Sequence, residues 1–412
     1  MNTIQLLKYG LNLTLDGYKQ LAFINRFLKP LVFKHCKRLG YRLSTSEKKK
    51  ILFYYPVYTV LACAQMYVTL KGRQLTKNET KRLTLVGAMA TICDDLIDED
   101  NWSREQIFHL LSKNLNEEGL TTKAKLLVSL NKELQKFYPL SEKYLKQLKT
   151  ALEWQAVSGK QSDPTITLDE IVHVCREKNG HTSLMFATLM DEDWSKKELQ
   201  FIYQSAIVGQ LTNDSFDMYF DIQNGIRTYF NTAPTIADVR KFFVDECSKL
   251  HAMVLACDTS LKNKLNTIRR MSILHAFTLT ALDQFQQTED KYGEEVDWKT
   301  VPRKDLVIDM ALNKNRFKTV GYMKWLSKVI PEPGDMLKTP TMKRKPVKSS
   351  ALKSVGYNEE KKLLEVEILE TGRIYQYKEV PLEEYMSFIE APSLGIYYNK
   401  IIKDRYEHDE VF

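Results

Sequence analysis

Cysteine, glycine and proline are all scarce in this sequence. Its 412 residues include six cysteines, 16 glycines and 12 prolines. No two cysteines form a CxxC pair, and their apolar neighbours indicate reduced, buried thiols, so we expect a cytoplasmic protein without a disulfide framework. The low glycine and proline content argues against a turn-rich β architecture and favours helices.

Several signatures are missing as well. Residues 1–15 lack the basic start, long apolar core and small-residue cleavage site of a secretory signal. The sequence contains no HExxH motif, no Ser-His-Asp signature and no glycine-rich phosphate loop. The formal net charge of +8 is moderate, and it is compatible with a diphosphate, RNA or a lipid headgroup as the partner.

One uncharged run is long enough to span a bilayer. It extends from Ile51 to Leu70. The run also contains Pro56, four tyrosines, two threonines and Gln65, a mixture more typical of a helix buried in a large bundle. We therefore expect no transmembrane segment, and access to a lipid substrate from the membrane surface is compatible with that expectation.

Residues 1–330 have the periodicity of successive helices with short polar loops between them. Thr76 with Glu79, and Thr167 with Glu170, have the spacing of a capping box at two helix starts. The helical patterns cover residues 17–39, 47–72, 76–99, 102–114, 121–138, 141–158, 167–190, 195–224, 235–252, 256–290 and 303–328. The sequence therefore predicts an all-α domain over residues 1–330.

The composition changes sharply at residue 330. Residues 331–348 are rich in proline and lysine and predict an extended basic linker, whose charges are either solvated or in contact with a polyanion. Beyond it, alternation over 364–368 and 374–377 predicts a β-hairpin. Helices should follow at 382–389 and from Ser393 to about Arg405. Residues 349–412 should therefore form a small α+β domain.

Two acidic clusters follow apolar stretches of the helical part. The first is DDLID at residues 94–98, and the second runs from Asn213 to Asp221. Four-residue steps put Asp94 and Asp98 on one helix face, and Asn213, Asp217 and Asp221 on another. Such oxygen ligands suit Mg²⁺, and a shared cation would relieve the repulsion between crowded carboxylates. Two facing helices with these stripes would make a metal site for a diphosphate.

These clusters resemble the motifs of class I isoprenoid synthases, the superfamily of trans-prenyltransferases, squalene and phytoene synthases and terpene cyclases. DDLID is similar to DDxxD. NDSFDMYFD at 213–221 resembles the terpene-synthase motif NDxxSxxxE, and QLTN at 210–213 resembles the second motif of squalene and phytoene synthases. Over residues 20–325 the resemblance implies an all-α isoprenoid-synthase helical bundle. It implies three Mg²⁺ ions held by Asp94, Asp98, Asn213, Asp217 and Asp221, with Asp95 as a further catalytic residue.

The sequence departs from chain-elongating prenyltransferases after the first motif. A single arginine, Arg104, follows where that family usually carries a pair, and no GGKRxRP-like segment precedes the motif. These departures indicate a divergent branch of the superfamily, whose product cannot be assigned by analogy.

Basic residues should meet the diphosphate. Arg176 and Lys178 precede Gly180 in a segment that resembles the diphosphate-contacting helix break of the superfamily; the alternative is an ordinary polar loop. Arg227 is a further candidate. Arg316, followed by an aromatic residue, resembles the Arg-Tyr pair near terpene-synthase C-termini, although a basic helix end is also what the helix dipole favours.

The C-terminal residues 346–408 resemble the KTSC domain, a module named for the C-terminus of some lysyl-tRNA synthetases. The matching segments include SSAL at 349–352, VGY at 355–357, LEVE at 364–367, YQY at 375–377 and APS at 391–393. The resemblance implies either protein docking or contact with RNA. The candidate RNA contacts are Lys353, Arg373, Lys400, Lys403 and Arg405.

Together these features predict an enzyme that acts on a prenyl diphosphate, as a prenyl-diphosphate transferase or a terpene synthase-like lyase. Mg²⁺-assisted ionisation of the allylic diphosphate would give a carbocation that aromatic side chains stabilise in a dry cavity. Condensation and cyclisation are both open. The candidate aromatics are Tyr54, Tyr55, Tyr58, Phe216, Tyr219 and Phe220. The alternative is a non-catalytic lipid- or diphosphate-binding protein with an RNA- or protein-binding C-terminal module, and a homodimer is compatible with either function.

Overall fold

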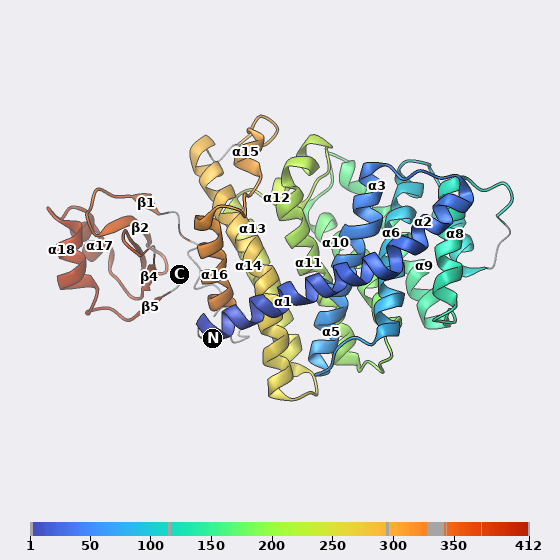
Figure 1. Cartoon of the computed structure of the whole chain (residues 1–412). Helices are drawn as coiled ribbons and strands as arrows, with labels where there is room; N and C mark the ends of the chain where they lie inside the picture. The colour runs from blue at the N-terminus through green and yellow to red at the C-terminus, as the bar shows by residue number, and fades with distance from the viewer. Residues whose placement is uncertain are drawn as a thin grey trace.

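The computed structural model describes residues 3–113, 117–293, 296–327, 342, 344–371 and 373–410, and the side chains of 3–9, 98 and 409–410 lie outside that description. The chain is mostly helical, and a small antiparallel sheet lies near its C-terminal end (Figure 1). This arrangement confirms the predicted order of a large helical part followed by a small α+β part.

The helical part contains sixteen described α-helices. They are α1 (Thr3–Phe23), α2 (Lys29–Leu39), α3 (Thr45–Lys49), α4 (Tyr55–Tyr58), α5 (Gln65–Leu70), α6 (Lys77–Asp98), α7 (Arg104–Ser112), α8 (Thr122–Gln135), α9 (Glu142–Val157), α10 (Leu168–Thr188), α11 (Lys196–Gln223), α12 (Tyr229–Thr232), α13 (Ile236–Ala256), α14 (Leu261–Tyr292), α15 (Arg303–Leu306) and α16 (Asn313–Leu326). The first helix begins at Thr3 instead of near residue 17, and the segment expected to be one helix over 303–328 is divided between α15 and α16.

Local capping explains most of the helix starts. Capping boxes, in which an N-cap hydroxyl and a Glu or Gln side chain exchange hydrogen bonds with the backbone, begin α3, α6, α7, α10 and α11. The boxes predicted at Thr76 and Thr167 are among them. These caps fix where α6 and α11 begin, and these two helices carry the acidic motifs further along.

The uncharged run forms a continuous helical stretch from α3 to α5. Two π-helical turns, Lys50–Tyr54 and Thr59–Ala64, interrupt its α-helical geometry. Pro56 accounts for the first, because proline lacks an N–H and its ring crowds the preceding turn, which widening relieves. Residues Thr45–Leu70 are long and apolar enough to cross a membrane, but 56% of the tested window is buried inside the protein. A helix of this length and composition also occurs in the core of soluble proteins.

A close helix crossing brings this stretch against α6. A Cβ added at Gly87 would lie 3.0 Å from the Cα of Pro56 and 3.1 Å from the carbonyl oxygen of Tyr55. Only glycine therefore allows α4 and α6 to approach so closely. The approach places the tyrosines of α4 beside the first acidic motif.

The C-terminal part is a five-stranded antiparallel sheet in the order β1-β2-β3-β4-β5. The strands are β1 (Lys345–Pro346), β2 (Leu352–Asn358), β3 (Leu363–Ile368), β4 (Ile374–Tyr377) and β5 (His408–Glu410), with helices α17 (Leu382–Ile389) and α18 (Leu394–Tyr397). The predicted hairpin is β3–β4, in which Val366 pairs with Tyr375. The C-terminal part has its own hydrophobic core, separate from that of the helical part. This core includes Leu352, Val366, Tyr377, Phe388 and Ile402.

The sheet also corrects the predicted linker boundary. Lys345 and Pro346 pair with Val355 and Ser354, so the end of the 331–348 segment belongs to the sheet. The side chain of Arg344 is also engaged, through hydrogen bonds to Ser354 and Glu365. Residues 328–341 and 343 lie outside the described residues.

Candidate functional site

A cavity of about 540 Å³ opens among α4, α6, α9, α10 and α11. Asp94 of the first acidic motif and Asn213 and Asp217 of the second line the same cavity, together with Lys178. The structure therefore brings members of both predicted motifs to one space, although they are more than a hundred residues apart in the sequence.

Two adjacent tyrosines connect the motifs. The hydroxyl of Tyr55 donates to Asp94 Oδ2 at 3.4 Å, and the hydroxyl of Tyr54 donates to Asn213 Oδ1 at 2.6 Å. Asn213 Nδ2 in turn donates to Asp217 Oδ2 at 2.8 Å. The two tyrosine rings meet edge to face with centroids 5.3 Å apart. This chain of contacts runs from one acidic helix to the other across α4.

Asp95 has a different position from Asp94. Its side chain is buried, and Lys50 Nζ lies 3.1 Å from its Oδ1. Lys50 lines the cavity, whereas Asp95 is not among the lining residues. Asp95 therefore positions a cavity lysine, which differs from the predicted direct catalytic role. The side chain of Asp98 lies outside the described residues.

The second motif holds carboxylates that burial makes hard to ionise. Burial raises the pKa of Asp214 to about 7, and burial together with the charges of Asp214 and Asp217 raises the pKa of Asp221 to about 8. Burial also raises the pKa of Asp217, against a hydrogen bond from Asn213. Within the described part of the chain, none of these three carboxylates has a Lys, Arg or His partner within ion-pair distance. Asp221 itself is not a lining residue of the cavity.

The oxygen atoms around the cavity decide whether it suits a divalent cation. Among the described side chains, no three His, Cys, Asp or Glu residues already stand together as a metal site. The oxygen-only donors of Asp94, Asn213 and Asp217 nevertheless match a hard cation such as Mg²⁺, and Asp217 has no cationic partner within ion-pair distance among the described residues. The residues fit Mg²⁺ as two half-sites that a diphosphate would join, because Mg²⁺ usually takes a few carboxylates and fills its shell with water and phosphate oxygens.

Of the predicted diphosphate-binding cations, Lys178 alone lines the cavity. Arg176 instead donates to Gln204 and Glu246, and its salt bridge to Glu246 spans 3.0 Å. Neither Arg227 nor Arg316 lines the cavity: Arg316 is exposed on α16 and donates to the carbonyl oxygen of Met310. These three arginines thus do not line this cavity.

The helix break expected near Gly180 is absent, because α10 runs unbroken from Leu168 to Thr188. A Cβ at Gly180 would lie 2.3–2.7 Å from ring atoms of Tyr203. This glycine therefore lets α10 and α11 pack closely. The close packing, and not a kink, brings Lys178 toward the cavity.

A second, more apolar cavity of about 440 Å³ adjoins the first. Tyr54, Tyr58 and Asn213 line both, so the two spaces meet at the tyrosine chain. Other lining residues of the second cavity are Met66, Phe186, Phe216, His275, Phe277 and Met310. Sequence reasoning found Phe216 but missed the others, because apolar residues at helical spacing look the same whether they face a core or a cavity.

Tyr219 and Phe220 belong to neither cavity lining. Their rings pack against the guanidinium of Arg303, whose central carbon lies 5.7 and 5.9 Å from the two centroids. Arg303 was not anticipated from the sequence. It brings a cation from α15 to the end of α11 that carries Asp221.

Comparison with known proteins assigns the small α+β part. The KTSC domain family model matches residues 348–406. An uncharacterized protein from Stutzerimonas stutzeri (strain A1501) is 42% identical over 65 residues, which make up 16% of this chain and 90% of that protein. The C-terminal part of this chain is a KTSC domain. The crystal structure of a KTSC domain protein from Yersinia pestis is 34% identical and covers 17% of this chain and 99% of that one, with a TM-score of 0.17.

The KTSC domain pairs at least two of its five candidate RNA-contacting cations internally. Lys353 pairs with Glu367 at 2.7 Å, and Arg405 pairs with Glu384 at 2.8 Å. A buried glutamate, Glu365, accepts hydrogen bonds from Arg344 and from Gln376. These pairs reduce the positive charge that the domain offers to a polyanion.

Proposed function

We propose that the helical part is a Mg²⁺-dependent class I isoprenoid synthase that ionises an allylic prenyl diphosphate. The observation that supports this proposal best is a cavity that brings members of both acidic motifs and Lys178 together on otherwise largely apolar walls, and that joins a second, more apolar cavity. A prenyl diphosphate has the same two-part chemistry, a polyanionic head and an apolar chain.

Each part of the chain would have a separate task. Lys178 and Lys50 would bind the diphosphate oxygens, and Asp94, Asn213, Asp217 and Asp221 would hold Mg²⁺. The bound cations would supply positive charge to the leaving diphosphate. Tyr54 and Tyr55 orient Asn213 and Asp94, respectively, through the hydrogen bonds described above.

The apolar cavity would receive the prenyl chain and exclude water from the carbocation. The ring faces of Tyr58 and Phe216, which line this cavity, would attract the cation by cation–π interaction. Such attraction is worth about 2 kcal/mol when the partners are desolvated. Whether the chain condenses or cyclises depends on a second substrate, which the cavity shapes leave open.

Turnover of prenyl diphosphates tests the proposal. The full chain is incubated with Mg²⁺ and prenyl diphosphates of increasing length, released diphosphate is measured, and products are extracted. Asp94→Ala and Asn213→Ala should each reduce turnover by at least about 10²-fold, because each removes a ligand that stabilises leaving-group charge. Asp258→Ala is the control, since the Asp258 side chain is 80% exposed at a distant helix end.

Two results would contradict the proposal. Full activity in the Asp94→Ala protein would remove the assigned role of the first motif. Mg²⁺-dependent binding of a prenyl diphosphate without release of diphosphate would support the non-catalytic binding protein instead.

A further inference from the structure

Helix α16 and the residue before it carry three exposed apolar side chains, here called the ridge. Phe317 is 77% exposed, Leu312 44% and Val320 41%. A phenylalanine left so exposed loses the burial that normally stabilises it. Phe317 and Val320 are three residues apart on one helix, so they lie on the same face.

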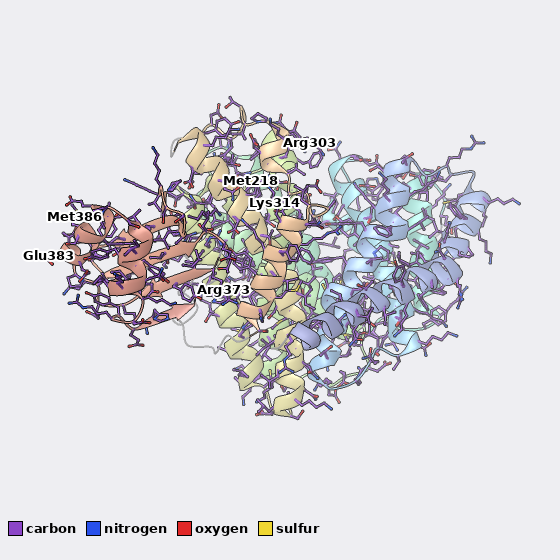
Figure 2. The ribbon with its side chains drawn as sticks, turned by 60° about the vertical axis from the view of Figure 1, so that its left-hand side comes forward. Met218, Arg303, Lys314, Arg373, Glu383 and Met386 are labelled. Carbon is purple, nitrogen blue, oxygen red and sulfur yellow. The ribbon has the colours of Figure 1, made fainter. Side chains whose placement is uncertain are left out.

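The ridge is flanked by positive charge. Residues 312–326 contain Lys314, Arg316, Lys318 and Lys324 and no Asp or Glu. Lys318 pairs with Asp283, whereas the other three are exposed. Figure 2 labels Lys314 on α16 and Arg303 on α15, and both helices pack against α14. The preceding loop contributes one acid, Asp309, whose Oδ1 accepts a hydrogen bond from the backbone of Ala311.

A residue next to the ridge contacts the wall of the apolar cavity. Arg316 Nε donates to the carbonyl oxygen of Met310 at 3.0 Å, and Met310 lines that cavity. Phe216, also a lining residue, is 36% exposed. One of the flanking cations therefore contacts a residue that lines the apolar cavity.

We propose that the ridge of Leu312, Phe317 and Val320, with its flanking lysines and arginines, docks on the surface of an anionic lipid bilayer. Exposed apolar side chains would enter the boundary between headgroups and acyl chains, while the cations bind the acidic headgroups. The lipid-soluble ligand of the apolar cavity would then enter from that surface. The docking itself does not depend on catalysis, and only this entry route rests on the proposed function.

Charge and size favour a bilayer over other partners. A second copy of the chain would oppose like charges across a two-fold contact. Three apolar side chains also fall far short of the roughly 800 Å² per partner that a stable protein interface buries. RNA would meet the cations, but Leu312 and Val320 offer no ring on which a base could stack.

Vesicle sedimentation of the full chain tests the docking. Wild-type protein is mixed with vesicles rich in phosphatidylserine or made of phosphatidylcholine alone, at low and high salt. We expect binding to the anionic vesicles that weakens with salt. The variant combines Phe317→Ser, Lys314→Ser and Lys324→Ser. It should bind about 100-fold more weakly, because each surface cation contributes about fivefold and the aromatic anchor the rest.

The matched control removes one exposed apolar residue and two lysines elsewhere. It combines Leu261→Ser, Lys262→Ser and Lys196→Ser, where Leu261 is 65% exposed at the start of α14. The control should bind vesicles like the wild type. Equal binding by the ridge variant, equal loss in the control, or salt-sensitive binding of a single-stranded RNA oligonucleotide without vesicle binding would each overturn the proposal. Binding of a short, water-soluble prenyl diphosphate should not change in the ridge variant, so failure of docking is distinguishable from failure of the proposed function.

Discussion

Asp221 should reduce stability in the absence of a metal ion, and its replacement should reveal that cost. Its pKa is raised from 3.8 to about 8, chiefly by burial and then by the charges of Asp214 and Asp217. An acid with a raised folded-state pKa destabilises the fold as pH rises, because the unfolded state ionises first. The penalty is absent below about pH 4, grows as pH rises, and is complete above about pH 8.

The size of the penalty follows from the pKa change. Ionising such a carboxyl in the folded state costs at most about 5–6 kcal/mol at one pKa unit per 1.4 kcal/mol. Asp221 is only half-buried, and solvent screening reduces this to about 3 kcal/mol. We therefore expect Asp221→Asn to raise the free energy of unfolding by about 3 kcal/mol near pH 8.5, and by almost nothing near pH 4.

Urea unfolding at several pH values, with and without Mg²⁺ and inorganic diphosphate, measures this effect. With both ligands present, the wild type should gain stability and the variant should gain less, since a ligand that binds the folded state stabilises it by mass action. Asp258→Asn, at an exposed carboxylate, should change stability by less than about 0.5 kcal/mol at any pH. A stability gain of Asp221→Asn that is the same at pH 4 and pH 8.5 would refute the electrostatic reasoning.

Three further predictions concern packing and domain structure. Gly180→Ala should destabilise the helical part by about 1–3 kcal/mol in urea, because the added Cβ meets Tyr203, whereas Gly159→Ala, with open space around it, should not. Burial lowers the pKa of His251 from 6.5 to about 4. This group should therefore cost the wild type about 1.4 kcal/mol of stability per pH unit as pH falls from about 6.5 to 4, because the unfolded state is protonated first. His251→Leu should lack this contribution, which urea unfolding at each pH measures. A chain of residues 1–330 should remain folded and bind Mg²⁺ with diphosphate, by circular dichroism and calorimetry, since the two parts have separate cores.

Local sequence signals predicted the helices and the acidic faces. Capping boxes and four-residue spacing depend on residues within one or two turns, so Thr76 with Glu79, and Asn213 with Asp217, were visible before the structure. The start of α1 was missed because residues 3–16 have no such cap. Strand β1 was missed because two residues carry no periodicity, and its pairing with Val355 depends on contacts distant in sequence.

Contacts between side chains of different helices could not be predicted from local sequence in the same way. Arg176 looked like a diphosphate ligand, but its position is decided by Glu246, a residue of another helix. Gly180 looked like a helix break, and its role is decided by the ring of Tyr203. The sequence predicted catalytic roles for both Asp94 and Asp95, whereas in the structure Lys50 of the neighbouring helical stretch forms a salt bridge with Asp95. Tertiary contacts selected which of the candidate side chains reach the cavity.

Buried acids elsewhere in the protein differ from those of the second acidic motif in having a cationic partner. Glu79 is held by Arg73, with its pKa lowered to about 2; Glu246 is held by Arg176; and Asp283 is held by Arg240. In each of these three cases the protein itself supplies the cation that a carboxylate withdrawn from solvent needs. On α11 it supplies none to Asp217 or Asp221 among the described residues, and both pKa values are raised instead. The half-buried carboxylates of Asp217 and Asp221 therefore cost stability at a site that lines or adjoins a cavity. Groups that lower stability in this way are typical of a functional site, where a bound ligand supplies the missing partner.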